Sequence, residues 1–84
     1  MSPETNLLYE RVCGVIARTF RLDRDGITSE LGVGEIDAWD SLGHLTLMMA
    51  IEHEFSVRFS TEQIGTPKTV SEICQLLSQV VMNE

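Results

Sequence analysis

One hydroxyl in this 84-residue chain stands where a covalent group could be attached and kept in solvent. Ser41 lies in the segment 39–45 (Trp-Asp-Ser-Leu-Gly-His-Leu), where a polar loop becomes an apolar, helically periodic stretch. We expect Asp40 to cap that helix, so that Ser41 is its first residue and is exposed. A phosphodiester on Ser41 would sit at the positive end of the helix dipole, while solvent and the capping bond reduce its repulsion from Asp40. The segment therefore predicts a tether at Ser41 rather than a reaction centre.

The same segment contains the residue types of a serine hydrolase but not their arrangement. His44 lies three residues after Ser41, close enough on a helix to act as its base, with Asp40 as the orienting carboxylate. Asp40, however, is adjacent to the serine and poorly placed to hold the far side of the imidazole. The Gly-x-Ser-x-Gly motif is absent, and a chain of this length has little room for a deep pocket. We therefore expect no catalytic residue, and we interpret His44 as a packed or loop-bonding side chain.

No metal site is expected either. The segment 23–26 (Asp-Arg-Asp-Gly) begins like a calcium-binding loop, but Thr28 and Gly34 stand where an EF-hand needs its glycine and its last glutamate. His53 has no second histidine four residues later, so the zinc-binding helix motif is absent, and we place His53 on a solvated polar face.

The composition predicts a single domain, residues 1–84, with acidic character. Thirteen acidic residues against six basic ones give a formal net charge of −7, which argues against nucleic acid and anionic membranes as partners. The charge favours partners with basic docking surfaces, although it could also serve solubility alone. No apolar run approaches the roughly 20 residues of a membrane span, and no signal peptide is evident. We therefore expect a cytoplasmic monomer with Cys13 and Cys74 as small hydrophobic residues, although the sequence leaves a disulfide between them open.

The hydrophobic pattern predicts an all-α fold, a four-helix bundle of three longer helices and one short helix. The first helix covers about the first twenty residues, and the second starts after Asp40 and ends near residue 55. The segments 60–63 (Ser-Thr-Glu-Gln) and 69–72 (Thr-Val-Ser-Glu) have the form of capping boxes, which predict the starts of the short helix and of the last one.

A long loop, residues 21–40, is expected between the first two helices. A structureless loop of this length is unusual in a compact domain, so we expect a turn or short helix near residues 28–31. Its spaced apolar side chains would plug one end of the bundle. Gly14, in the middle of the first helix, suggests a close helix crossing.

The second helix has more apolar surface than one contact in a bundle needs. A rotation of about 100° per residue separates its apolar side chains into two stripes. The first stripe also takes in His44 and contains Leu47, Met48, Ile51 and Phe55. The second contains Leu42, Leu45 and Met49. Periodicity alone leaves open whether both stripes are core. We favour a docking role for the second, because it starts beside Ser41 and is flanked by acidic residues. The expected recognition residues are Asp40, Leu42, Leu45, Met49 and Glu52.

In this order and spacing, the segments resemble the acyl carrier protein family, including the carrier domains of polyketide and nonribosomal peptide assembly. The resemblance covers nearly the whole chain, through 39–45, 50–55 (Ala-Ile-Glu-His-Glu-Phe), Val57, Phe59 and 69–73. It implies that Ser41 receives 4′-phosphopantetheine from coenzyme A through a phosphopantetheinyl transferase. The terminal thiol would then hold an acyl or aminoacyl group as a thioester, supplied by a loading enzyme and delivered to synthases or transferases. In the same way, Asp40 matches the family's acidic residue before the serine, and Leu42, Leu45, Met49 and Glu52 match its recognition surface.

Four positions depart from the members that serve fatty-acid synthesis. Gly43 and His44 replace an acidic and a small polar residue, Thr46 replaces an acidic contact residue, and Trp39 replaces a small residue. The resemblance is therefore closer to discrete carriers of polyketide, nonribosomal peptide or other specialised biosynthesis, with fatty-acid synthesis as the alternative. A hypothesis of another class is an unmodified helical module that binds a partner through Leu42, Leu45 and Met49.

Overall fold

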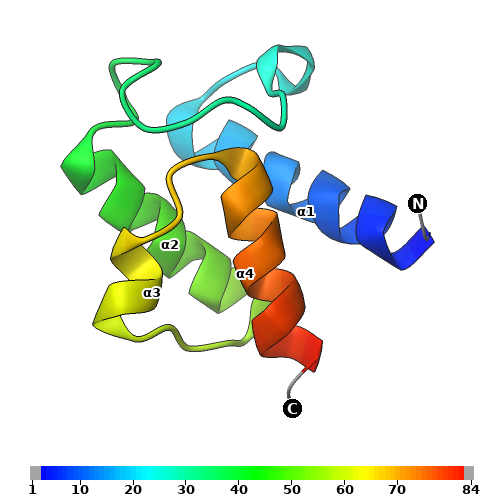
Figure 1. Ribbon diagram of the computed structural model, residues 1–84. Helices are drawn as coiled ribbons and strands as arrows, with labels where there is room; N and C mark the ends of the chain where they lie inside the picture. Colours follow the sequence, from blue (N-terminus) through cyan, green and yellow to red (C-terminus); the bar gives the residue numbers. More distant parts are fainter. Residues whose placement is uncertain (1–2, 83–84) are drawn as a thin grey trace.

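The computed structural model describes the backbone of residues 3–82 and the side chains of residues 7–81. Within this part of the chain there are four α-helices, one short 3-10 helix and no strand, so the predicted all-α four-helix bundle is confirmed. In chain order the elements are α1 (Pro3–Phe20), η1 (Arg24–Gly26), α2 (Ser41–Phe55), α3 (Thr61–Gly65) and α4 (Val70–Met82). α1 packs against both α2 and α4, and the short α3 lies against α2 (Figure 1).

Local capping bonds explain where α2 and α3 begin. Oδ1 of Asp40 accepts a hydrogen bond from the Gly43 N–H at 2.8 Å, so Asp40 is the predicted N-cap of α2. At α3 the capping box is complete. The Gln63 N–H donates to Oγ of Ser60 at 3.1 Å, and the Ser60 N–H donates to Oε1 of Gln63 at 2.9 Å.

The predicted capping box at α4 forms only in part. The Glu72 N–H donates to Oγ1 of Thr69 at 3.2 Å, as the motif requires. The Glu72 carboxylate, however, accepts the N–H of Lys68 at 2.7 Å rather than that of Thr69. The side chain therefore reaches one residue beyond the N-cap and ties the start of α4 to the connection that precedes it.

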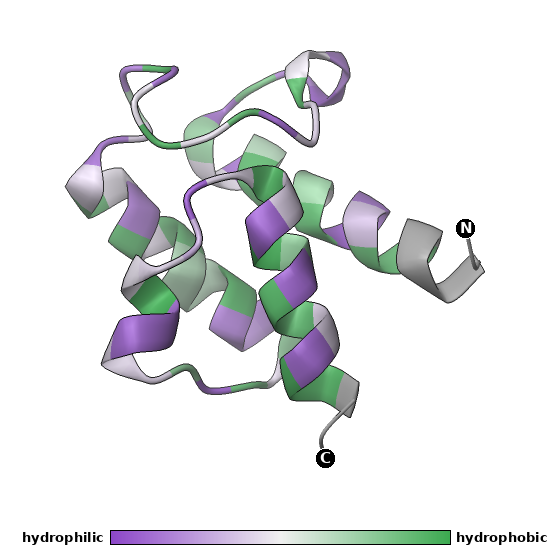
Figure 2. Ribbon diagram, viewed as in Figure 1, coloured by the Kyte–Doolittle hydropathy of each residue, from purple (hydrophilic) through white to green (hydrophobic). Residues whose placement is uncertain are grey.

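The core is formed where the apolar faces of the long helices meet. Figure 2 shows hydrophobic and hydrophilic residues on different sides of these helices. Fully burying one such side chain stabilises the fold by roughly 1.5–3 kcal/mol. The buried apolar residues are Val12, Cys13, Val15, Ile16, Ile27, Trp39, Leu47, Met48, Ile51, Val57, Phe59, Val70, Ile73 and Leu77. Gly14 does not mark a close helix crossing, because a Cβ added there would meet no atom within 4 Å; that expectation was wrong.

The middle of the long loop is tied to the start of α4. The predicted turn is present, since the Leu31 N–H donates to the Thr28 carbonyl at 3.2 Å, but the short helix η1 lies upstream of it. Beyond the turn, the Val33 N–H donates to the Lys68 carbonyl at 2.9 Å. Gly32 permits this approach, because a Cβ at that position would clash with the same carbonyl. The loop thereby crosses the start of α4 and closes one end of the bundle (Figure 1).

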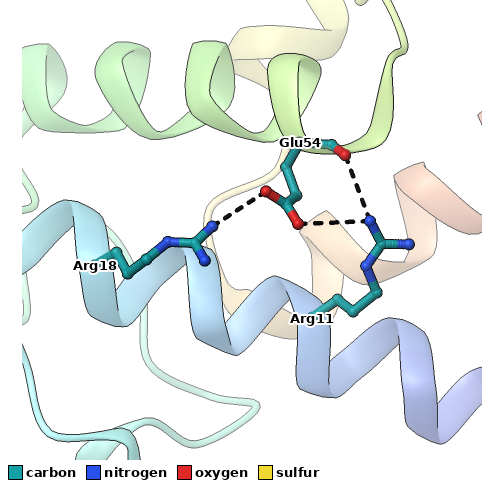
Figure 3. A network of polar contacts seen from close by, with 3 residues as sticks. All are labelled: Arg11, Arg18 and Glu54. Carbon is teal, nitrogen blue, oxygen red and sulfur yellow. Dashed lines mark hydrogen bonds and ion pairs between the residues drawn. The ribbon is translucent and has the colours of Figure 1, made fainter.

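A surface network joins α1 to the C-terminal half of α2 (Figure 3). The Glu54 carboxylate pairs with Arg18 at 3.2 Å and with Arg11 at 3.5 Å. The Arg11 guanidinium also lies 4.4 Å from the centre of the Phe55 ring. Both arginines are largely exposed, so each pair contributes at most about 1 kcal/mol to stability.

Candidate functional site

Ser41 is the first residue of α2 and is exposed, as predicted. The preceding residue, Asp40, has extended backbone angles, and the chain turns into the helix directly after it. Among the described residues, no hydrogen-bond partner is found for the Ser41 hydroxyl. The hydroxyl is therefore available to another molecule at the positive end of the helix dipole.

Gly43 allows the loop to lie against the first turn of α2. A Cβ at this position would clash with the carbonyl oxygen of Ala38. Any other residue would push the last turn of the loop away from the serine end of the helix. This steric role could not be predicted from the sequence, because the contact depends on how the loop folds back.

His44 is buried and joins the loop to α3. Its Nδ1 accepts a hydrogen bond from Nε1–H of Trp39 at 3.0 Å, and its Nε2 donates to the carbonyl oxygen of Ile64 at 2.9 Å. The indole N–H can only donate, so Nδ1 carries no proton and the imidazole is the neutral Nε2–H tautomer. The Trp39 and His44 rings are stacked, with centres 6.2 Å apart. Trp39 also packs against the ring of Phe20, with the two ring centres 5.3 Å apart.

The environment of His44 favours its neutral form. Burial lowers the pKa of His44 below its ordinary value, and the positive charge of Lys68 adds to this effect, while the hydrogen bond to Ile64 opposes it. Both ring nitrogens are engaged in structural bonds. His44 is therefore not a base for Ser41, and the interpretation as a packed, loop-bonding residue is confirmed.

One of the two apolar stripes of α2 is exposed. Leu47, Met48 and Ile51 are fully buried. In the other stripe, Leu42 is 71% exposed, Leu45 42% and Met49 57%. We call these three residues the apolar strip. Because the strip runs along α2 from the residue after Ser41, a partner that reaches the serine can also cover it.

The acidic groups near the strip gather at its serine end. Glu35, Asp37 and Asp40 are all exposed in the loop that leads to Ser41. At the other end, Glu52 is half-buried, and its Oε2 accepts the Phe59 N–H at 2.8 Å. One oxygen of that carboxylate therefore ties α2 to the connection that follows it.

The remaining candidate groups do not form a second site in the described part of the chain. Cys13 and Cys74 are free thiols, and burial raises the pKa of Cys74 to about 11, so its thiol is unreactive at neutral pH. His53 is exposed, and no cluster of metal-ligating side chains is found among the described residues. A hollow of about 460 Å³ between α3 and α4 has neither Ser41 nor His44 in its lining. None of the described helices combines the length and the apolar character that crossing a membrane requires.

Comparison with known proteins gives several relatives, and two of them match this chain over most of its length. An acyl carrier protein of Petrotoga mobilis is 37% identical over 73 residues, which cover 86% of this chain and 85% of that protein. An acyl carrier protein of Thermosynechococcus vestitus is 28% identical over 74 residues, which cover 88% of this chain and 91% of the other. No protein-family model matches the chain.

Proposed function

The chain belongs to the acyl carrier protein family, and we propose that Ser41 is the residue to which its 4′-phosphopantetheine is attached. Proteins of this family are carriers rather than enzymes, and the prosthetic group is covalently bound. When bound, the group supplies a thiol that holds an acyl or aminoacyl group as a thioester. The observation that supports Ser41 most directly is its exposed hydroxyl at the first position of α2.

The surroundings of Ser41 fit a phosphodiester. A negative charge at the first turn of a helix is favoured by the helix dipole, by roughly 0.3–1 kcal/mol at an exposed position. The nearest acid, Asp40, uses Oδ1 to accept the Gly43 N–H. Exposure of Ser41 leaves room for an arm that moves freely, which raises the effective concentration of its cargo at a docked enzyme.

We propose that the apolar strip and the acids around it form the partner-recognition surface. Its partners would be the phosphopantetheinyl transferase, a loading enzyme, and synthases or transferases with basic docking surfaces. Asp40 would contact basic groups beside the serine, while the strip would enter an apolar groove. Glu52 would contribute at the far end with the carboxylate oxygen that Phe59 leaves free. The proposed surface comprises Asp40, Leu42, Leu45, Met49 and Glu52.

We further propose that residues 1–84 form one monomeric carrier domain that serves polyketide, nonribosomal peptide or other specialised biosynthesis. The support for the pathway class is the set of departures at Trp39, Gly43, His44 and Thr46. Fatty-acid synthesis is the alternative. The mass of the group found on protein isolated from its native cell separates the two.

Intact mass tests the attachment site. The full chain is incubated with coenzyme A and a phosphopantetheinyl transferase of broad specificity, and its mass should increase by one phosphopantetheine group. Ser41→Ala should show no increase, whereas Ser29→Ala, which removes another exposed loop hydroxyl, should be modified like the unaltered chain. Modification that persists in Ser41→Ala would refute the proposal.

The unmodified interaction module predicts a different result. In that case Ser41→Ala would keep its full activity in the cell, while Leu45→Asp would abolish it by placing a charge in the apolar strip. The carrier proposal expects both variants to be defective. Ser41→Ala should fail through loss of the attachment site, and Leu45→Asp through weaker binding to partners.

A further inference from the structure

The hydrogen bond between Trp39 and His44 connects the loop end directly before Ser41 to the first turns of α2. We propose that this bond is a pH-sensitive latch, which fixes residues 34–40 against α2 and opens when Nδ1 of His44 takes a proton. The latch is a property of the fold and does not depend on the modification of Ser41. It makes Trp39 and His44 positioning residues for the serine, which neither of them touches chemically.

The two bonds of His44 respond differently to protonation. Nδ1 accepts from the Trp39 indole, which has a proton to donate and no lone pair to offer. A proton on Nδ1 therefore places two donors face to face and breaks this bond. The bond from Nε2 to the Ile64 carbonyl survives, because the imidazolium is the stronger donor. Protonation thus breaks the bond between His44 and the loop and keeps the bond between His44 and α3.

The loop end depends on Trp39 for its attachment. The Trp39 carbonyl accepts the Gly34 N–H at 2.8 Å, and the Trp39 N–H donates to the Ile36 carbonyl at 3.1 Å. These bonds hold residues 34–39 as one local turn. The buried indole and the close contact between Ala38 and Gly43 fix that turn to α2. Loss of the indole hydrogen bond therefore loosens the turn that carries the chain into Ser41.

The charged groups around His44 oppose its protonation or lie in solvent. Lys68, from the connection between α3 and α4, is the described charged residue that acts on the imidazole, and its sign disfavours a second positive charge. Asp37 and Asp40 from the loop and Glu62 from α3 are exposed to solvent. Burial lowers the pKa of His44, so the latch is closed at neutral pH and opens only on acidification.

Amide hydrogen exchange of the full chain, followed by NMR between pH 7.5 and 4.5, tests the latch. Protection factors, corrected for the intrinsic rate at each pH, should fall for Gly34 and Trp39 once His44 protonates. The expected loss is about tenfold for each pH unit between the ordinary pKa of histidine, about 6.5, and the lowered pKa of His44 in the folded chain, and it levels off below the folded pKa. The amides of Ile64 and Thr66 in and after α3 should keep their protection, and the Trp39 indole N–H resonance should shift with the ring nitrogens of His44.

Three variants make the test specific. His44→Gln offers one acceptor and a donor without titrating, so the pH dependence at Gly34 and Trp39 should disappear. His53→Gln, which removes the exposed histidine of the same helix, should behave like the unaltered chain. Trp39→Phe removes the donor, so the loop end should be loose at all pH values.

The latch is refuted if protection at Gly34 and Trp39 stays constant while the His44 ring nitrogens titrate. It is equally refuted if Ile64 and Thr66 lose protection to the same extent, because the bond to α3 should survive. A pH dependence that persists in His44→Gln would also overturn it. If His44→Gln does not fold, the unaltered chain and Trp39→Phe still decide between these outcomes.

Discussion

The two apolar faces of α2 contain the same kinds of side chain in opposite surroundings. Leu47, Met48 and Ile51 are fully buried, whereas Leu42, Leu45 and Met49 of the apolar strip are exposed. Exposed leucine and methionine add little to folding stability. Their arrangement in one strip beside Ser41 is therefore better explained by contact with other proteins than by the needs of the bundle.

The largest expected effect separates the two faces directly. Leu47→Ala should lower the free energy of unfolding by about 2–5 kcal/mol, because it removes a fully buried side chain and leaves a cavity. Leu42→Ala, the matched change in the apolar strip, should alter it by less than about 0.5 kcal/mol. Urea unfolding of both variants measures the difference, and equal losses would mean that the strip belongs to the core.

A pair of glycines extends the comparison to the face of α2 that meets the loop. Gly43→Ala should destabilise the fold by about 1–3 kcal/mol, because its Cβ would displace the Ala38 carbonyl. Gly14→Ala, in the middle of α1 with open space around it, should stabilise it by about 0.5–1 kcal/mol. The midpoint temperature of thermal unfolding should therefore fall in Gly43→Ala and rise in Gly14→Ala. An unchanged midpoint in Gly43→Ala would show that the loop does not lie in close contact with this face of α2.

The buried histidine of α2, His44, gives a smaller effect on stability that depends on pH. The pKa of His44 is lowered in the folded chain, so the unfolded chain binds more protons between that pKa and its own value of about 6.5. The contribution of His44 is complete above about pH 6.5 and is lost as the pH falls through the folded pKa. The loss is about 1.4 kcal/mol for each unit by which the two pKa values differ.

Carboxylates also titrate in acid, so this contribution is measured as a difference between variants. The drop in stability from pH 7.5 to 5 should be smaller in His44→Gln than in the unaltered chain. His53→Gln, on the exposed side of α2, should leave the drop unchanged. Equal pH profiles for His44→Gln and the unaltered chain would contradict the effect.

The helices could be predicted from the sequence because their signals are local. Asp40 and Ser60 cap helices whose first turns lie within three residues of them, and the spacing of apolar residues is a property of one helix. The spacing of apolar residues also predicted the wide apolar surface of α2. It left open which stripe is exposed, since that depends on where the other helices pack.

The parts that could not be predicted depend on contacts between distant segments. Ile64 lies 20 residues after His44, and no pattern marks its carbonyl as a hydrogen-bond partner. The position of His44 on the buried stripe was the available signal, and it indicated a packed or loop-bonding side chain without identifying the bonding partner. In the same way, the Glu52 carboxylate was expected at the surface, and its bond to Phe59 depends on how the chain turns after α2.

The contacts of the serine segment determine how the chain can be redesigned. Trp39 needs the acceptor on His44, His44 needs the indole donor, and Gly43 makes room for the backbone that brings the indole into place. Introducing any one of these residues alone into a different carrier would therefore leave it without the contacts that it depends on. A chimera that transfers the docking helix to another scaffold must therefore take the preceding loop end with it, as one inherited block.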